Sequence, residues 1–179
     1  MTEKIIIAGA GGQGIMVLGK VLAEAAMRED KYVTWFPSYG AEVRGGTANC
    51  MVVISDEEIG SPYINKADSM IIMNEPSLLR FSSRIKEKGL LIINSSLSKS
   101  QPDTKAYVLR YPFTDIALQA GNIKVANIVA LGCFIAKSKV VNINTVMQVI
   151  NDFAPQNRRE LAVINKNALK AGKELIESK

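Results

Sequence analysis

The residues best able to bind a ligand form two glycine-rich segments near the start of the chain. The first, Gly9-Ala10-Gly11-Gly12-Gln13-Gly14, follows the apolar run 5–8 and leads into an amphipathic stretch. A glycine turn between a strand and a helix exposes free amides at the helix N-terminus, which attract phosphate and other anions. The chemistry to expect is anion or dinucleotide binding, although many such turns only pack a helix on a sheet.

The second segment, residues 37–47, surrounds an arginine and a glutamate with glycines. The Arg44 guanidinium suits bidentate pairing with a carboxylate or phosphate, and Glu42 can orient it. Glycine loses more backbone entropy on folding than other residues, so the glycines indicate close approach of a ligand or partner. The remaining candidate residues of this segment and the strand after it are Ser38, Tyr39, Gly40, Gly45, Gly46, Thr47 and Asn49.

A complete dinucleotide site needs an acidic residue about 20 positions after the glycine turn, where it binds a ribose hydroxyl. The expected second strand, residues 32–36, has no acid at its end. Glu29 and Asp30 precede that strand and are expected to end the helix before it. NAD binding is therefore disfavoured.

Several kinds of catalytic site are excluded by composition. The chain has no histidine, which excludes Ser-His-Asp and Cys-His nucleophiles and histidine zinc sites. Cys50 and Cys133 lie far apart and neither belongs to a C-x-x-C pair, so this chain alone builds neither an iron–sulfur cluster nor a structural zinc site. We expect both thiols to be buried and reduced, as in a cytoplasmic protein.

The charge distribution argues against nucleic-acid and membrane partners. The net charge is +5, but no basic run is interleaved with aromatic residues as a nucleic-acid surface requires. The most apolar helical segment, residues 123–136, is too short to span a bilayer. Residues 1–4 enter a strand at once and leave no room for a signal peptide.

Alternating strands and helices predict one α/β domain over residues 1–179. Strands are expected at 5–8, 32–36, 49–54, 69–73, 90–93 and 105–109. Helices are expected at 13–28, 112–120 and 122–136, from Pro76 through Ile85 with Asn74 as cap, after a cap at Asn142 or Asn144, and after Pro155. This order predicts a single doubly wound, mostly parallel sheet in a Rossmann-like three-layer domain. Ligands of such sheets bind at the carboxyl ends of the strands, where segments 9–14, 37–47, 74–76 and 94–96 should converge.

The two glycine-rich segments also occur together in a known family. Gly9-Ala10-Gly11-Gly12-Gln13-Gly14 followed by Pro37-Ser38-Tyr39-Gly40-Ala41-Glu42-Val43-Arg44-Gly45-Gly46 resembles the gamma subunit of the 2-oxoacid:ferredoxin oxidoreductases. Residues 47–50, 54–56 and 127–132 also resemble that family, so the likeness covers nearly the whole chain. The first motif alone is weakly specific, whereas the two motifs in this order and at this separation are specific.

The resemblance implies a subunit that is not catalytic alone. Complexes of this family cleave a 2-oxoacid oxidatively with thiamine diphosphate and Mg2+, pass electrons through [4Fe-4S] clusters to ferredoxin, and release an acyl-CoA. These cofactors are expected on the partner subunits alpha, beta and delta, and none is expected on this chain alone. The 2-oxoacid is 2-oxoglutarate, a branched-chain oxoacid or pyruvate, because the residues that select it are expected on other subunits.

The resemblance also suggests roles for the two segments. Residues 11–14 could offer amides to an anion or to a neighbouring subunit, and Arg44 could pair with coenzyme A (CoA) or with a partner's carboxylate. We expect subunit contact rather than direct ligand contact, because arginines buried in assemblies often serve packing and register. The alternative from another class is a free-standing Rossmann-like nucleotide-binding protein.

Overall fold

One six-stranded sheet organises the described part of the chain, which in the computed structural model comprises residues 1–38, 47–154 and 159–178. The strands are β1 (Thr2–Ala10), β2 (Tyr32–Ser38), β3 (Thr47–Ser55), β4 (Ala67–Ile72), β5 (Ile85–Asn94) and β6 (Tyr107–Tyr111). The helices are α1 (Ile15–Met27), α2 (Glu75–Phe81), α3 (Phe113–Gln119), α4 (Ala126–Ser138), α5 (Ile143–Phe153) and α6 (Arg159–Glu177), with 3-10 turns η2 (Ser82–Arg84) and η3 (Ile123–Val125).

The strand order is β2-β3-β1-β4-β5-β6, and the pairs β1–β4, β4–β5 and β5–β6 are parallel. β3 is the exception, because it runs antiparallel to both β2 and β1. β2 therefore still runs parallel to β1, with β3 inserted between them. The expected doubly wound, mostly parallel α/β sheet is confirmed. Because β3 is reversed, the end of β2 at Ser38 and the start of β3 at Thr47 both lie at the carboxyl end of β1. We call these two strand ends the mouth of the β2–β3 hairpin.

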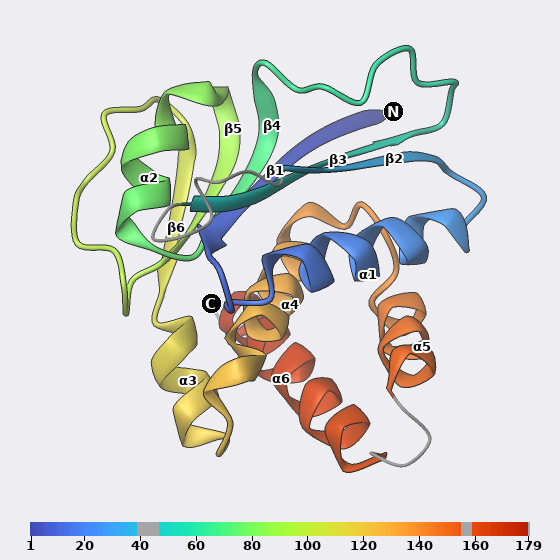
Figure 1. Cartoon of the computed structure of the whole chain (residues 1–179), viewed down its shortest axis with the longest axis vertical. Coiled ribbons are helices and arrows are strands. Elements are labelled where there is room, and N and C mark those ends of the chain that lie inside the picture. The colour runs from blue at the N-terminus through green and yellow to red at the C-terminus, as the bar shows by residue number, and fades with distance from the viewer. Residues whose placement is uncertain (39–46, 155–158, 179) are drawn as a thin grey trace.

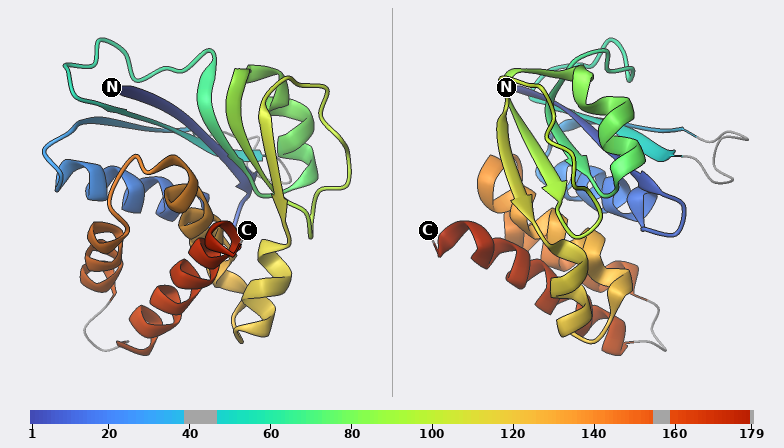
Figure 2. Two further views of the ribbon diagram at one scale, coloured as in Figure 1. Left: turned by 180° about the vertical axis from the view of Figure 1, so that it is seen from behind. Right: turned by 90° about the vertical axis from the view of Figure 1, so that its left-hand side faces the viewer.

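Helices cover the two faces of the sheet unequally. One face carries α1 and α4 with α3, α5 and α6 packed around them, whereas α2 packs on the other face beside segment 56–66 (Figures 1 and 2). Alternate residues of β1 divide between the two cores: Ile5 and Ile7 face the larger helical layer, and Ile6 and Ala8 face α2. Burial on both faces explains why the central strands are continuous apolar runs.

Two helices of the larger layer meet backbone to backbone. A Cβ atom on Gly132 of α4 would lie 2.1 Å from the Leu169 carbonyl oxygen, and one on Gly172 of α6 would lie 1.9 Å from the Val129 carbonyl oxygen. Only glycine fits at either position. Residues 126–135 of α4 are all buried, which confirms it as a core helix. Within the described ranges, the helices lack the combined length and hydropathy needed to cross a bilayer.

The helix after β4 differs in length from its expected form. Asn74 caps it, as expected, because Ser77 N donates to Asn74 Oδ1 at 3.1 Å. The helix ends at Phe81, however, and Ile85 is the first residue of β5. The prediction was wrong at Ile85 because this side chain shares a core with Phe81, and burial alone does not distinguish helix from strand. Of the two expected caps of α5, Asn142 is the one observed.

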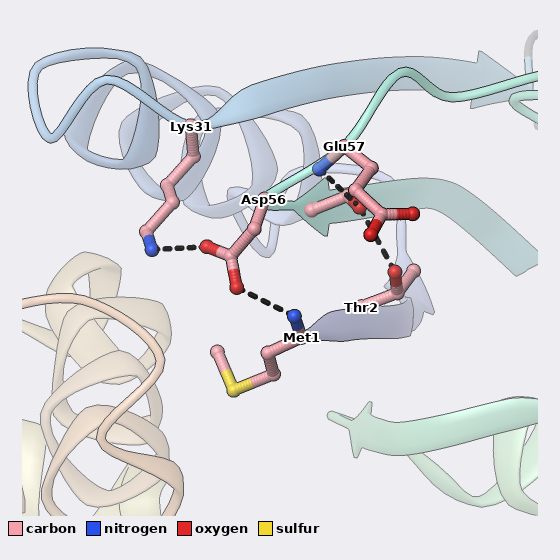
Figure 3. Close-up of polar contacts among 6 residues, drawn as sticks. Met1, Thr2, Lys31, Asp56 and Glu57 are labelled. Atoms are coloured by element: carbon pink, nitrogen blue, oxygen red, sulfur yellow. Dashed lines mark hydrogen bonds and ion pairs between the residues drawn. The ribbon is translucent and has the colours of Figure 1, made fainter.

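A charge cluster fixes the amino end of β1, at the edge opposite the glycine turn (Figure 3). The Asp56 carboxylate accepts hydrogen bonds from the Met1 amino group, at 2.5 Å, and from Lys31 Nζ. These contacts lower the pKa of Asp56 to about 2, and the Lys31 hydrogen bond is the largest cause. Thr2 Oγ1 and Ser55 Oγ share a hydrogen bond of 2.9 Å beside them. The cluster ties β1 to the end of β3 without approaching the candidate site.

Candidate functional site

The glycine turn is closed by the side chain of Gln13. Its Oε1 accepts a hydrogen bond from Ala10 N at 2.6 Å, and its Nε2 donates to the Met73 carbonyl oxygen at 3.2 Å. Gln13 N also donates to Ala10 O at 3.2 Å. The side-chain amide that the sequence suggests for an external anion is thus used to tie the end of β1 to the residue after β4.

The glycines of the turn fall into two groups. A Cβ on Gly9 would lie 2.6 Å from Gln13 Oε1, and one on Gly14 would lie 2.3 Å from Asn127 Nδ2, so packing forbids a side chain at either position. Gly11 and Gly12 are exposed, and a Cβ on Gly12 would meet no atom within 4 Å. The open part of the turn is therefore the Gly11–Gly12 backbone, which a ligand or a partner can approach.

A buried network of amides supports the turn from below. Asn94, at the end of β5, donates through Nδ2 to Met73 O at 3.2 Å and to Thr114 Oγ1 at 2.8 Å. Met73 N in turn donates to Ala8 O at 2.8 Å. The Met73 carbonyl thus accepts from both Gln13 and Asn94, which joins the carboxyl ends of β1, β4 and β5. Such a satisfied, buried network makes this edge of the sheet rigid.

The second glycine-rich segment enters and leaves this same edge. Ser38 is exposed at the end of β2, whereas Thr47 and Asn49, at the start of β3, are buried. Thr47 Oγ1 accepts a hydrogen bond of 3.0 Å from Arg80 Nη1 of α2. The other predicted positions of this segment lie outside the described residues, and their roles stay predictions: Tyr39, Gly40, Glu42, Arg44, Gly45 and Gly46.

The polar segment after β4 holds the loop that follows β5. The Glu75 carboxylate accepts hydrogen bonds from the Ser100 hydroxyl and from Lys99 N, the latter at 2.8 Å. These bonds, the Ser100 hydroxyl first, lower the pKa of Glu75. Arg110 of β6 donates to the Ser100 carbonyl oxygen at 2.8 Å. The carboxyl edge therefore holds segments 9–14, 74–76 and 94–96 together with the described ends of segment 37–47, and the segments after β4 and β5 bind each other.

The described residues hold neither a metal cluster nor a reactive thiol at this edge. Across residues 1–38, 47–154 and 159–178, no three His, Cys, Asp or Glu side chains gather to hold a metal ion. Burial raises the pKa of the Cys50 thiol to about 12, so this group stays protonated at neutral pH and is a poor nucleophile. What the described part of the edge presents is the exposed backbone of Gly11 and Gly12.

Comparison with known proteins decides the family. The family model described as "Pyruvate ferredoxin/flavodoxin oxidoreductase" matches residues 4–175. The chain belongs to this family. The resemblance that the two glycine-rich motifs indicated is therefore confirmed.

Members of the pyruvate ferredoxin/flavodoxin oxidoreductase family differ in length. Ketoisovalerate oxidoreductase subunit VorA of Methanothermobacter marburgensis is 36% identical over 133 residues, which are 74% of this chain but 28% of VorA. The 2-oxoglutarate synthase subunit KorC of the same organism is 33% identical over 184 residues, covering 98% of this chain and 97% of KorC. A crystal structure of a keto/oxoacid ferredoxin oxidoreductase gamma subunit from Geobacter sulfurreducens has a TM-score of 0.86 at 30% identity, with 99% of each chain covered. This chain thus spans 28% of VorA but nearly all of the shorter relatives.

The sequence of this family member did not predict the hydrogen bonds that two residues make at the site. Asn127 lies in the segment 127–132 that resembles the family, but its hydrogen bond to Gly14 O, at 3.0 Å, depends on the packing of α4 against the turn. Arg80 lies on a short helix and belongs to no motif, so only the structure shows its contact with Thr47. Side chains that bind backbone carbonyls or distant hydroxyls leave no spacing pattern in a sequence.

Proposed function

We propose that this chain is the gamma subunit of a multi-subunit 2-oxoacid:ferredoxin oxidoreductase. The complex oxidatively decarboxylates a 2-oxoacid to an acyl-CoA and passes the electrons to ferredoxin. The observation that carries the proposal is the coextensive match with KorC and with the Geobacter gamma subunit. A match over whole chains favours an assembled subunit over a free-standing nucleotide-binding protein. Relatives named for 2-oxoglutarate, for ketoisovalerate and for pyruvate keep 2-oxoglutarate, branched-chain oxoacids and pyruvate as the substrate class.

The redox and thiamine cofactors are assigned to the partner subunits. A [4Fe-4S] cluster needs four cysteine ligands, and Mg2+ of thiamine diphosphate needs oxygen ligands around the diphosphate. Cys50 and Cys133 are buried and lie in no disulfide, and the amides of Gln13 and Asn127 bind the protein's own backbone. These residues do not fit either group, so we assign both to the alpha, beta and delta subunits. Buried thiols outside disulfides suit a reducing compartment, and we place the complex in the cytoplasm.

The two glycine-rich segments serve assembly in this proposal. The exposed Gly11–Gly12 backbone can bind either a phosphate of CoA or the backbone of a neighbouring subunit. We favour the subunit, because Gln13 and the buried amide network fix the turn as a rigid shape rather than leaving side-chain donors for a ligand. Arg44 is proposed to pair with a carboxylate of that subunit.

Co-expression with the alpha, beta and delta subunits tests the function. We expect a stable complex that reduces a low-potential viologen dye only with a 2-oxoacid and CoA present. A complex that turns over equally well without this chain would contradict the proposal. Saturable binding of NADH or FAD to the isolated chain, followed by Trp35 fluorescence at micromolar ligand, would instead favour a free-standing nucleotide-binding protein. Within the complex, Arg44→Ala should weaken assembly or raise the KM for CoA, with Arg44→Lys as the control that keeps the charge.

A further inference from the structure

The sheet face that carries α2 exposes a group of aromatic, aliphatic and cationic side chains. This α2-face patch comprises Phe36, Tyr63, Lys66, Leu79, Arg80 and Arg84. The exposed fractions are 43% at Phe36, 59% at Tyr63 and 69% at Leu79. The other face lies under α1, α4 and the helices around them, so the patch is on the thinly covered side of the domain (Figure 2).

Arginine–aromatic contacts make one half of the patch continuous. The Arg84 guanidinium lies 5.5 Å from the ring centre of Tyr63 and 5.8 Å from that of Phe81. Arg80 lies 5.5 Å from the same Phe81 ring and donates to Thr47 Oγ1 at the start of β3. The arginines thus connect α2 both to segment 56–66 and to the mouth of the hairpin.

The other half is connected through β3. Ile64 N donates to Met51 Sδ at 3.2 Å, and Met51 pairs with Phe36 across the β2–β3 ladder. Phe36, Met51 and Thr47 lie on the same face of the sheet, since side chains alternate along strands. The buried residues Met51 and Ile64 therefore connect Phe36 of β2 to segment 56–66, and Arg84 connects that segment to Phe81 of α2.

Lys66 and Arg84 bring positive charge to the patch. Lys66 Nζ donates to the Ser83 carbonyl oxygen at 2.6 Å, and Arg84 donates to the carbonyl oxygens of Ile64 and Asn65. Neither cation meets a carboxylate within the described ranges. Arginine and aromatic residues are enriched at the centres of protein interfaces, and interfacial cations are matched by acids on the partner. The composition fits a protein surface that is apolar with carboxylates at its rim.

We infer that the α2-face patch docks the polypeptide that continues beyond this domain in the longer relatives. VorA carries the matching region in 28% of its length, so there the remainder is covalently joined to this domain. In KorC of the same organism, of which the match covers 97%, the same contact has to form between subunits. The partner is thus the protein subunit equivalent to that remainder, presenting acidic side chains to Lys66 and Arg84. The inference rests on the proposed function.

The test uses the co-expressed complex with exposed positions changed one at a time. Leu79→Asp and Tyr63→Asp alter the patch, and Val163→Asp and Tyr107→Asp are matched controls, exposed by 57% and 65% on α6 and β6. We expect the patch variants to weaken partner binding about tenfold or more and the controls less than about twofold, as measured by interferometry. Lys66→Glu should slow association most at low salt. Urea unfolding of each isolated variant checks that the fold is kept.

Other results would contradict either the docking surface or the proposed function. Equal partner binding by patch variants and controls would remove the patch as the docking surface and leave the gamma-subunit function intact. Failure of the wild-type chain to form any complex would contradict the proposed function itself. If the isolated chain dimerises in sedimentation and Leu79→Asp abolishes the dimer, the occupant is a second copy and the inference is wrong. It is also wrong if Tyr63→Asp removes binding of a fluorescent single-stranded RNA.

Discussion

Replacing Gly14 by alanine measures how tightly the glycine turn is held. Gly14 has φ of 70°, and the left-handed conformation alone costs alanine about 1 kcal/mol. The new Cβ would also lie 2.3 Å from Asn127 Nδ2, which donates to Gly14 O from a residue that is only 4% exposed. Displacing that buried amide costs a further ~1–3 kcal/mol. We therefore expect Gly14→Ala to lower the free energy of unfolding by about 2–4 kcal/mol.

Gly12 provides the matched control for this prediction. Its φ is 86°, but a Cβ there would meet no atom within 4 Å. Gly12→Ala should therefore lower the free energy of unfolding only by the conformational cost of about 1 kcal/mol. The double variant Gly14→Ala/Asn127→Ala removes the clashing amide, so its destabilisation should fall below the sum of the single variants by about 1 kcal/mol.

Guanidinium unfolding followed by the fluorescence of Trp35, the single tryptophan, gives the required free energies. The slope of the free energy of unfolding against guanidinium concentration should be the same in all variants, since each variant alters the native state only locally. If Gly14→Ala costs no more than Gly12→Ala, or if the effects at Gly14 and Asn127 simply add, then α4 does not pack on the turn as described. The carboxyl edge of the sheet would then not be rigid at the glycine turn.

Three further changes probe the rest of the fold. Gly172→Ala would place a Cβ 1.9 Å from the Val129 carbonyl oxygen, so calorimetry should show a loss of about 3 kcal/mol, and a wild-type midpoint would contradict the α4–α6 contact. The pKa of Asp56, about 2, lies below its ordinary 3.8, so its ion pairs stabilise the fold above about pH 4 and are lost as the pH falls toward 2. The urea midpoints of wild type and Asp56→Asn should therefore converge over that interval, and a gap that persists at pH 2 would rule the mechanism out. Because burial raises the pKa of Cys50 to about 12, a Cys133→Ser protein should react with a thiol reagent only on unfolding, and rapid labelling of the native protein would show the site to be open.

Hydropathy periodicity predicted the order and type of the elements well, because most core strands are buried on both faces and most helices have one apolar stripe. It did not predict the reversal of β3. The connection between β2 and β3, residues 39–46, is of hairpin length, whereas parallel neighbours need a long crossover, so this signal was present in the sequence. The secondary structure of Ile85 does not follow from its hydropathy, since a buried residue after a short helix fits either a longer helix or the next strand.

The sequence predicted where the site lies in the fold, but it did not predict the hydrogen-bond partners of its side chains. Strand order placed the glycine turn and the hairpin mouth at one edge, and the register Ala10–Thr47 agrees with this. The role of Gln13 differed, because its amide donor is taken by the Met73 carbonyl, and backbone acceptors carry no residue-type signal. Arg80 was missed for a different reason, since its hydroxyl partner Thr47 lies 33 positions away in the sequence.

The antiparallel β3 links the two glycine-rich motifs into one unit. Ala10 of the turn pairs with Thr47, and Ala8 pairs with Asn49, so the start of β3 is registered against the end of β1. A slip of one residue would move Cys50 from the α1 face to the α2 face and would break the Thr47–Arg80 hydrogen bond. The turn, the hairpin mouth and α2 therefore hold one relative position. A partner that binds the α2 face therefore contacts α2 and β3 in a register that is fixed against the end of β1.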